Sequence, residues 1–471
     1  MAETGDTRMD TIMPKLPGRW ISLPFEECLS NEGIRFKKLK KKQIRPSGKY
    51  PVVDQGERFI TGFVDDENDL FIGPLPVIVF GDHTRRLKYL DFRFAVGADG
   101  TKLLHPFKSL LPKFFYYYLK SLNLTSQGYS RHYRFLKAIN VPIPSQNEQR
   151  RIVAKLEKLL QKVDACKERL DKIPSILKRF RQSVLAAACS GRLTEDWREK
   201  NPDVESATEL LKQIQEERKE KRLRNTQILQ IDMDVLPDTW AKTKISDVYD
   251  INPGHKDLEI DEKSEVSFIP MKLIEEETGF MDASFFRKYE EVKGGYTKFI
   301  EDDVVFAKIT PCMENGKIAI AKNLCNGIGC GTTELHVFRP VVKDTNSFLF
   351  YFLLQKDIRE MAKNRFQGTS GHLRVPPDFF EEIWFPLPPL AEQQEIVHHV
   401  EALFKIADQI EERYNKARVY VDKLTQSILA KAFRGELVPQ DPNDEPASEL
   451  LKRIQGEKDG QIKKQAKKVK I

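Results

Sequence analysis

Basic side chains are concentrated in one short stretch near the start of the sequence. The segment RFKKLKKKQIR, residues 35–45, contains Lys37, Lys38, Lys41 and Arg45. Ammonium and guanidinium groups bind phosphate oxygens, so this stretch is a candidate for contact with a nucleic-acid backbone. A solvated loop or strand edge has the same composition, and the sequence leaves both interpretations open.

Two further stretches in the same part of the chain mix basic residues with side chains that donate and accept directional hydrogen bonds. FGDHTRRLKY (80–89) follows an apolar run, and SQGYSRHYRF (126–135) combines small, aromatic and basic residues. Such side chains, presented on loops, read base edges in the major groove of DNA. The candidates are His83, Thr84, Arg85, Arg86, Gln127, Tyr129, Ser130, Arg131, His132, Tyr133 and Arg134.

A second set of candidates of the same chemical kind lies in the second half of the chain. It comes from FAKITPCMENGK (306–317) and from FQGTSGHLRV (366–375). The candidates are Lys308, Thr310, Asn315, Lys317, Gln367, Thr369, Ser370, His372 and Arg374. Polar, glycine-containing loops at equivalent places favour a shared binding role, although a shared structural turn remains the alternative.

The two sets are equivalent because the chain is a tandem repeat. PIPSQNEQRRIVAKLEKLLQKVD (142–164) returns as PLPPLAEQQEIVHHVEALFKIAD (386–408). Trp20 matches Trp240, Arg134 matches Arg374, and Glu148 matches Glu392. We therefore expect four segments: a first variable block (1–144), a first helical block (145–235), a second variable block (236–388) and a second helical block (389–471).

The helical blocks carry a heptad pattern. Apolar residues recur in alternating steps of four and three from Ile152 to Val184, and again from Ile396 to Ile428. This spacing predicts two long helices that pair with each other as a coiled coil. The stretch from Ile152 to Val184 would span about 48 Å as a helix. Pro174 should kink the first helix, because proline lacks a backbone N–H donor and crowds the preceding turn.

The variable blocks have a different pattern. Short β-rich runs such as YPVVDQG, LPVIVFGDH, VSFIPMKLI, DVVFAKITP and TELHVFRP are bounded by Gly, Pro, Asp and Asn. KFFYYYLKSL predicts one helix in the first block, and FLFYFLLQKDIREMAKNRF predicts one helix in the second. The pattern indicates two α+β domains.

Charge separates the two variable blocks. Residues 16–144 hold 21 Lys and Arg against 12 Asp and Glu, a net charge of +9, whereas residues 236–388 hold 19 against 25, a net charge of −6. If both blocks bind the same kind of polyanion, bulk charge cannot explain the second. We then expect a local basic patch on that block, with its acidic residues turned away.

The amino-acid composition indicates which broad class of protein this chain belongs to. Forty per cent hydrophobic and 31% charged residues are typical of a soluble globular protein, and no run of 18 apolar residues predicts a membrane span. Six cysteines without a Cys-x-x-Cys pair indicate reduced thiols, a cytoplasmic location and no metal site.

Motifs of catalysis are also missing from the sequence. It contains no phosphate-binding P-loop, no Gly-x-Gly-x-x-Gly motif, no His-Glu-x-x-His pair and no Asn-Pro-Pro-aromatic tetrapeptide of amino-methyltransferases. These absences argue against an autonomous enzyme, and we expect no catalytic residue on this chain.

The repeat, the heptads and the segments QSVLAAACSGRLTEDW (182–197) and QSILAKAFRGELVPQD (426–441) together resemble the specificity (S) subunit of Type I restriction–modification systems. The resemblance covers essentially the whole chain. It implies two target-recognition domains, the variable blocks, held apart in a pseudo-two-fold arrangement by a long antiparallel coiled coil. Each domain would read one half of a bipartite, asymmetric duplex site.

The resemblance also implies partners. Double-stranded DNA, two modification subunits and restriction subunits would bind, with no membrane involved. S-adenosylmethionine, ATP and Mg would belong to the partner subunits, leaving no cofactor on this chain. The 48 Å spacer is somewhat longer than one duplex turn of about 34–36 Å, which agrees with two separated half-sites. Heptads alone leave one alternative open, a coiled-coil scaffold whose two domains bind partners other than DNA.

Overall fold

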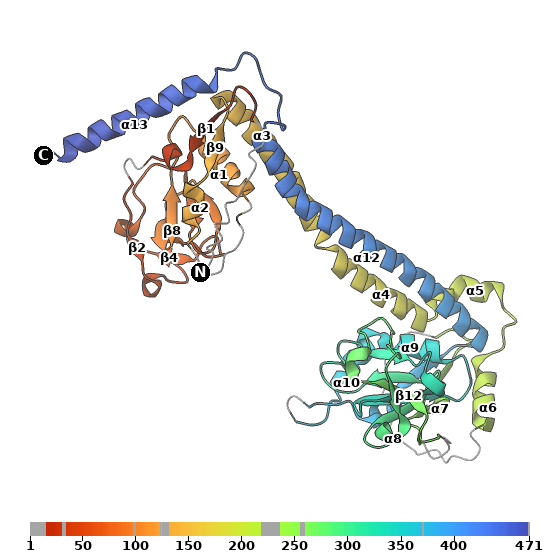
Figure 1. The fold of residues 1–471 in the computed structure, drawn as a ribbon. Helices are drawn as coiled ribbons and strands as arrows, with labels where there is room; N and C mark the ends of the chain where they lie inside the picture. The colour runs from red at the N-terminus through yellow and green to blue at the C-terminus, as the bar shows by residue number, and fades with distance from the viewer. Residues whose placement is uncertain are drawn as a thin grey trace. The chain divides into compact units, whose positions relative to one another are not determined.

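The computed structural model describes residues 16–30, 34–97, 100–122, 124, 131–217, 236–254, 260–369 and 372–469. These residues form two compact units. Unit 1 consists of Met1–Asp171 with Asn415–Ile471, and unit 2 consists of Lys172–Tyr414. Each unit therefore combines one variable block with helices from both helical blocks (Figure 1).

Two small β-sheets form the first variable block in unit 1. One has the strand order β2-β7-β3-β4, with β3 and β7 parallel, and the other is antiparallel with the order β6-β5-β8. The strands are β2 (Lys38–Leu39), β3 (Tyr50–Val53), β4 (Gly62–Val64), β5 (Val77–Gly81), β6 (Leu87–Leu90), β7 (Ala95–Gly97) and β8 (Thr101–Leu104). Every residue of β5 is buried, as its continuous apolar run predicts.

The two ends of this block meet in a third, two-stranded sheet. Strand β1 (Ile21–Pro24) pairs antiparallel with β9 (Asn140–Ile143). The remaining elements are α1 (Pro112–Ser121), α2 (Tyr133–Lys137) and the short 3₁₀ turns η1 (Phe25–Cys28), η2 (Lys41–Gln43) and η3 (Glu67–Asp69). Helix α1 confirms the helix predicted from KFFYYYLKSL, and it begins on a proline, whose missing N–H costs nothing in the first turn.

Helices from both helical blocks complete the core of unit 1. They are α3 (Gln146–Leu170), the C-terminal part of α12 (Leu390–Phe433) and α13 (Ala447–Val469). Buried Leu156 on α3 belongs to one apolar cluster with Phe433 of α12 and Leu450 of α13. The first variable block therefore packs against residues that lie about 300 positions later in the chain.

The second variable block in unit 2 is built on a similar plan. Its sheets have the strand orders β13-β12-β17-β14, β11-β18-β15-β16 and β10-β19. The strands are β10 (Ala241–Lys244), β11 (Tyr249–Ile251), β12 (Glu265–Ile269), β13 (Phe286–Lys288), β14 (Thr297–Ile300), β15 (Val304–Ala307), β16 (Ile318–Ile320), β17 (Ile328–Gly331), β18 (Leu335–Pro340) and β19 (Trp384–Leu387). The parallel pair β12–β17 corresponds to β3–β7 of the first block.

Helices of unit 2 cover these sheets. Within the variable block they are α7 (Ile245–Val248), α8 (Tyr289–Val292), α9 (Asn346–Leu354), α10 (Lys356–Lys363) and α11 (Pro377–Glu382), with the 3₁₀ turns η5 (Met271–Leu273) and η6 (Cys325–Gly327). The helical blocks add α4 (Ile173–Cys189), η4 (Arg192–Thr194), α5 (Glu195–Lys200), α6 (Ala207–Glu217) and the N-terminal part of α12. Leu185 of α4, Leu210 of α6 and Val400 of α12 share one apolar cluster with the block.

One helix prediction in this block is wrong. FLFYFLLQKDIREMAKNRF forms two helices, α9 and α10, because Gln355 between them is extended with ψ 137°. Helix α9 is buried on all sides, whereas α10 buries only Ile358, Arg359 and Ala362. Helix α9 is therefore covered around its whole circumference, whereas α10 is covered on one face only.

The long helices follow the heptad prediction with one interruption. The first helix is broken between α3 and α4, at Asp171 and Lys172, and Pro174 lies in the first turn of α4. The break therefore lies beside the proline at which a kink is predicted. Helix α12 has no proline and runs unbroken for 44 residues.

Ion pairs join these helices within each unit, where α12 lies beside α3 and beside α4 (Figure 1). In unit 1, Lys167 of α3 pairs with Asp422 of α12 at 3.1 Å. In unit 2, Arg181 of α4 pairs with Asp408 at 2.7 Å and with Glu411 at 2.9 Å.

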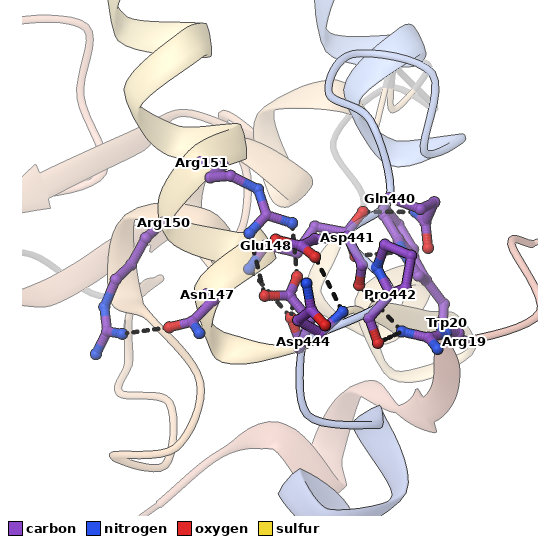
Figure 2. Close-up of polar contacts among 12 residues, drawn as sticks. Arg19, Trp20, Asn147, Glu148, Arg150, Arg151, Gln440, Asp441, Pro442 and Asp444 are labelled. Carbon is purple, nitrogen blue, oxygen red and sulfur yellow. Dashed lines mark hydrogen bonds and ion pairs between the residues drawn. The ribbon is translucent and has the colours of Figure 1, made fainter.

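A buried carboxylate fixes the first variable block to its helices. Glu148, 3% exposed, accepts hydrogen bonds from the Trp20 indole at 3.1 Å and from the Gln440 amide at 2.6 Å (Figure 2). Beside it, Arg151 donates both guanidinium nitrogens to Asp444, at 3.1 and 2.6 Å. Trp20 from the first variable block and Gln440 and Asp444 from the second helical block therefore meet at the start of α3. Among the described residues, no helix is both long and apolar enough to cross a membrane.

Candidate nucleic-acid interface

In the first variable block, the structure brings two of the predicted stretches together. The turn between β5 and β6 holds Asp82, whose backbone oxygen accepts from the backbone N–H of His132 at 2.8 Å. Its carboxylate accepts from the backbone N–H of Tyr133, also at 2.8 Å. The stretches 83–86 and 131–134 therefore lie side by side at the end of β5, and their exposed residues border one surface.

Arginines dominate this surface. Arg85 has a left-handed backbone with φ 60° and donates from its guanidinium to the backbone oxygen of Leu124 at 2.5 Å. Arg86 is exposed and pairs with Glu57 at 2.7 Å. With Lys120 of α1 they line an open groove of about 640 Å³. A bulky residue with positive φ is rare, and such strain is concentrated at functional sites.

Several candidates in this block are engaged in the fold itself. His132 is fully buried, and Thr84 donates from its hydroxyl to the backbone oxygen of Gln55 at 2.5 Å. The backbone N–H of His83 is also bound to Gln55, through its side-chain oxygen at 3.1 Å. Tyr133 is half-buried, and burial raises the pKa of its phenol. These four residues therefore shape the surface rather than project from it.

The remaining described candidates of this block are exposed. Arg131 and Arg134 are both exposed, and Arg134 stacks on the Phe135 ring at 4.8 Å. In the basic stretch, Lys37 pairs with Asp69 at 3.1 Å and Arg45 with Asp65 at 2.8 Å. Lys38, Lys41 and Lys42 are exposed on β2 and η2. The candidates Gln127, Tyr129, Ser130 and Ser370 lie outside the described residues.

In the second variable block, the two predicted stretches also meet. The backbone N–H of Thr310 donates to the oxygen of Leu373 at 3.1 Å, and the N–H of Val375 donates to the oxygen of Lys308 at 2.9 Å. Gln367 and Arg374 exchange two backbone hydrogen bonds of 2.9 Å. The loop after β15 is therefore tied to the segment before α11, in the same way as in the first block.

Arg374 is held at this place by an acidic residue that the sequence did not single out. Its Nε and Nη2 donate to the two carboxylate oxygens of Glu334, each at 2.7 Å. These hydrogen bonds lower the pKa of Glu334, so the carboxylate stays ionised near neutral pH. Burial lowers the pKa of the Lys308 ammonium, against the negative charge of Glu334, which raises it.

The other candidates of the second block divide into two groups. Lys317 donates to the backbone oxygens of Met271 and Ile274, at 3.1 and 2.8 Å, and so fixes a turn. Thr310 donates to Glu314 at 2.5 Å, and Asn315 donates to Glu276 at 2.9 Å. Gln367, Thr369 and His372 are exposed. Among the described residues, no cluster of His, Cys, Asp or Glu could hold a metal ion.

The two blocks can be superposed by their backbone hydrogen bonds. Asp82 N–H donates to the oxygen of Gly100 at 2.8 Å, and Lys308 N–H donates to the oxygen of Glu334 at 2.9 Å. The matching bonds from His132 and Val375 then make Arg131, not Arg134, the counterpart of Arg374. Glu334 therefore lies at the position that is equivalent to Gly100 in the first block.

Comparisons with known proteins agree on one family. A family model described as the Type I restriction modification DNA specificity domain matches residues 32–175 and 237–417. The chain is 36% identical over 346 residues to the Type I restriction enzyme EcoAI specificity subunit of Escherichia coli, covering 61% of this chain and 58% of that protein. It is 34% identical over 330 residues to the E. coli EcoDI specificity subunit, covering 68% of this chain and 69% of that one.

Solved structures share the fold. A chain from a study of complex assembly and conformational transition of the type I R-M system has a TM-score of 0.60 at 17% identity, covering 90% of this chain and 99% of that chain. The HsdS subunit from Thermoanaerobacter tengcongensis has a TM-score of 0.51, also at 17% identity, covering 90% of this chain and 98% of that chain.

The chain spans less than two thirds of two of its relatives: its matches cover 58% of the EcoAI subunit and 57% of the EcoEI subunit. With both variable blocks matched by the family model, the chain belongs to the Type I restriction modification DNA specificity family.

Proposed function

We propose that this chain is the sequence-specific DNA-recognition subunit of a Type I restriction–modification complex. One observation carries the proposal: each variable block joins a loop after a buried strand (β5 or β15) to the segment before its exit strand (β9 or β19), and polar and basic side chains gather there. Loops of this chemistry suit base readout. Family membership favours this function over a scaffold that binds partners other than DNA.

The two blocks read different halves of one bipartite, asymmetric site. Their interface residues differ in kind, since Glu334 pairs with Arg374, whereas Gly100 lies at the position equivalent to Glu334 in the first block. Their charges differ as well, +9 for residues 16–144 and −6 for residues 236–388. Two unlike surfaces cannot bind the two identical halves of a palindrome equally well.

The division of the chain follows the repeat. Residues 1–144 and 236–388 are the two target-recognition domains, and residues 145–235 and 389–471 are the conserved helical regions. The long helices form an antiparallel coiled coil with pseudo-two-fold symmetry, whose length sets the unread gap. The ion pairs Lys167–Asp422 and Arg181–Asp408 support this pairing.

The chain itself performs no chemistry in this proposal. It is a cytoplasmic subunit that positions two modification subunits, which methylate adenine with S-adenosylmethionine, and restriction subunits, which use ATP and Mg. The missing catalytic motifs support this division of labour.

A duplex-selection experiment tests the proposal. The full chain, co-produced with the modification subunit of its native host, is used to select from a random duplex library. Enrichment of a motif with two unlike halves is expected, together with binding that weakens steeply with salt. Selection of no motif by the purified complex, or binding of S-adenosylmethionine by the isolated chain, would contradict it.

A further inference from the structure

The Arg374–Glu334 pair has a geometry that goes beyond a simple ion pair. Glu334 binds one side of the guanidinium, through Nε and Nη2 at 2.7 Å each. The backbone oxygen of His372 accepts from the third nitrogen, Nη1, at 2.8 Å. The guanidinium plane is therefore fixed from two directions.

This arrangement leaves one edge of the guanidinium unused. Arginine has five N–H donors, one on Nε and two on each Nη. The three bonds to Glu334 and His372 use one donor on each nitrogen. Among the described residues, no further acceptor contacts Arg374, so one N–H remains on Nη1 and one on Nη2. Because Glu334 takes the Nε–Nη2 edge, the remaining N–H of Nη2 lies on the edge that Nη2 shares with Nη1, and the Arg374 side chain is 39% exposed. We take the remaining N–H of Nη1 to lie on this same edge, so that the two donors form a fork.

A forked pair of donors fits two kinds of nucleic-acid acceptor, the O6 and N7 atoms of guanine or two phosphate oxygens. The charges favour guanine. Glu334 offsets the positive charge of Arg374, and the variable block as a whole carries −6. A phosphate gains most from an uncompensated cation, whereas the neutral edge of a base needs mainly direction. A fixed, charge-compensated fork therefore suits base readout.

The first variable block lacks this device. Gly100 occupies the position of Glu334, and Arg131 the position of Arg374. Arg131 is exposed, and among the described residues no carboxylate pairs with it. The difference lies at one equivalent position of two domains that share a fold, where a difference in the base recognised is expected.

We propose that Arg374 reads a guanine in the half-site bound by the second variable block, and that Glu334 is a positioning residue that holds its fork. This inference rests on the proposed function and specifies it for one residue pair. It also explains how an acidic domain binds DNA: recognition there depends on directional hydrogen bonds more than on bulk charge.

The test compares four single variants in the duplex-selection experiment, each as full chain with its modification subunit. Arg374→Lys keeps the charge but loses the fork. Preference for guanine at one position of one half-site should fall roughly 5- to 150-fold, with the other half unchanged. Glu334→Gln should weaken the preference at the same position. It should also raise affinity for non-target duplex, because an uncompensated cation remains.

Arg339→Lys is the matched control. Arg339 also forms a fork with a carboxylate, Asp303, through Nε and Nη2 at 2.9 and 2.8 Å, but Asp303 is only 1% exposed. This variant should lower thermal stability and leave the motif unchanged. Melting curves of all variants separate misfolding from lost recognition, and Arg374→Gln serves as a second substitution at the fork.

Three outcomes would overturn the inference. The motif stays unchanged in Arg374→Lys and Arg374→Gln. Alternatively, Arg374→Gln weakens binding to all duplexes equally and reduces the salt slope by about 0.9, as loss of a phosphate contact does. Thirdly, Glu334→Gln melts earlier but keeps full guanine preference, which makes Glu334 merely structural. A wild-type complex that selects no motif would instead refute the proposed function, so the two failures are distinguishable.

Discussion

The Trp20 indole donates a hydrogen bond to Oε2 of Glu148, 128 residues later in the chain, at 3.1 Å. Trp240 and Glu392 repeat this contact in unit 2 at 2.8 Å. The third partner differs: Gln440 binds Glu148, whereas Thr194 and Arg198 bind Glu392. In both units, these additional partners of the glutamate come from the helical block that does not contain the glutamate. Each repeat is therefore completed by residues of the other repeat.

Removing the indole donor should destabilise unit 2. In Trp240→Phe, the fully buried Glu392 loses one of its hydrogen bonds, and a cavity forms beside it. A buried group left short of a partner costs about 1–3 kcal/mol of unfolding free energy. Chemical denaturation checks this, with Trp197→Phe as the control, because the Trp197 indole makes no hydrogen bond among the described residues. Equal losses in both variants would count against the account.

Glu148 should make stability depend on pH in a specific direction. Burial is the largest cause and raises its pKa above 4.5, against the hydrogen bonds from Trp20 and Gln440. The folded chain then binds this proton more tightly than the unfolded chain, so stability falls as pH rises through the window just above 4.5. Glu148→Gln should remove that slope.

Melting temperatures of wild type and Glu148→Gln from about pH 4.5 to about pH 7 check this prediction, and their difference should shift in favour of the variant as pH rises. Asp444→Asn, compared with wild type from about pH 5 down to about pH 2.5, provides the opposite sign. The hydrogen bond from Arg151 lowers the pKa of Asp444, so its contribution is present above 3.8 and is lost as pH falls below that value. Parallel melting curves for wild type and Glu148→Gln would show that Glu148 does not titrate as described.

Two glycine-to-alanine substitutions in the second helical block should have opposite effects. Gly435 has φ 76°, and a Cβ there would clash with Cγ of Pro17, so Gly435→Ala should destabilise unit 1 by more than the roughly 1–2 kcal/mol of left-handed strain. Gly456 lies in α13 with nothing near a Cβ, so Gly456→Ala should stabilise by about 0.5–1 kcal/mol. Thermal unfolding measures both, and a neutral Gly435→Ala would mean that the Pro17 contact is absent in solution.

The exposed lysines of the first variable block should contribute to the salt dependence of DNA binding. Replacing Lys41 and Lys42, both exposed on η2, with alanine should reduce the salt slope by about 1.8 without changing the selected motif. The pair Lys158 and Lys162, exposed on α3, provides a control of equal charge. Equal changes of the salt slope in both double variants would mean that the lysines act through the overall charge of the protein and not through local phosphate contacts.

Local patterns in the sequence were sufficient for much of this fold. Continuous apolar runs predicted β5 and β15, and the heptads with Pro174 predicted where the first long helix breaks while α12 continues. These features depend on adjacent residues or on residues three or four positions apart, so a single sequence is enough to predict them. The helix predicted across Gln355 failed because tertiary burial, not periodicity, separates α9 from α10.

The contacts of the candidate site could not be predicted from the sequence, because they depend on the register of the β-sheets. Glu334 and Arg374 lie 40 residues apart and meet only once β18 has paired with β15. The same register makes Arg131 the counterpart of Arg374, where sequence alignment chose Arg134. Polar composition also could not distinguish projecting side chains from those the fold uses, such as Lys317 and His132.

Mapping methylated adenines in the genome of the native host tests the central claim most directly, that two unlike domains of one chain each read their own half of a DNA site. The account predicts a single motif with two different specified halves, a fixed unread gap between them, and a change in only one half when Arg374 is replaced. A continuous or palindromic motif, or a substitution that alters both halves together, would contradict it.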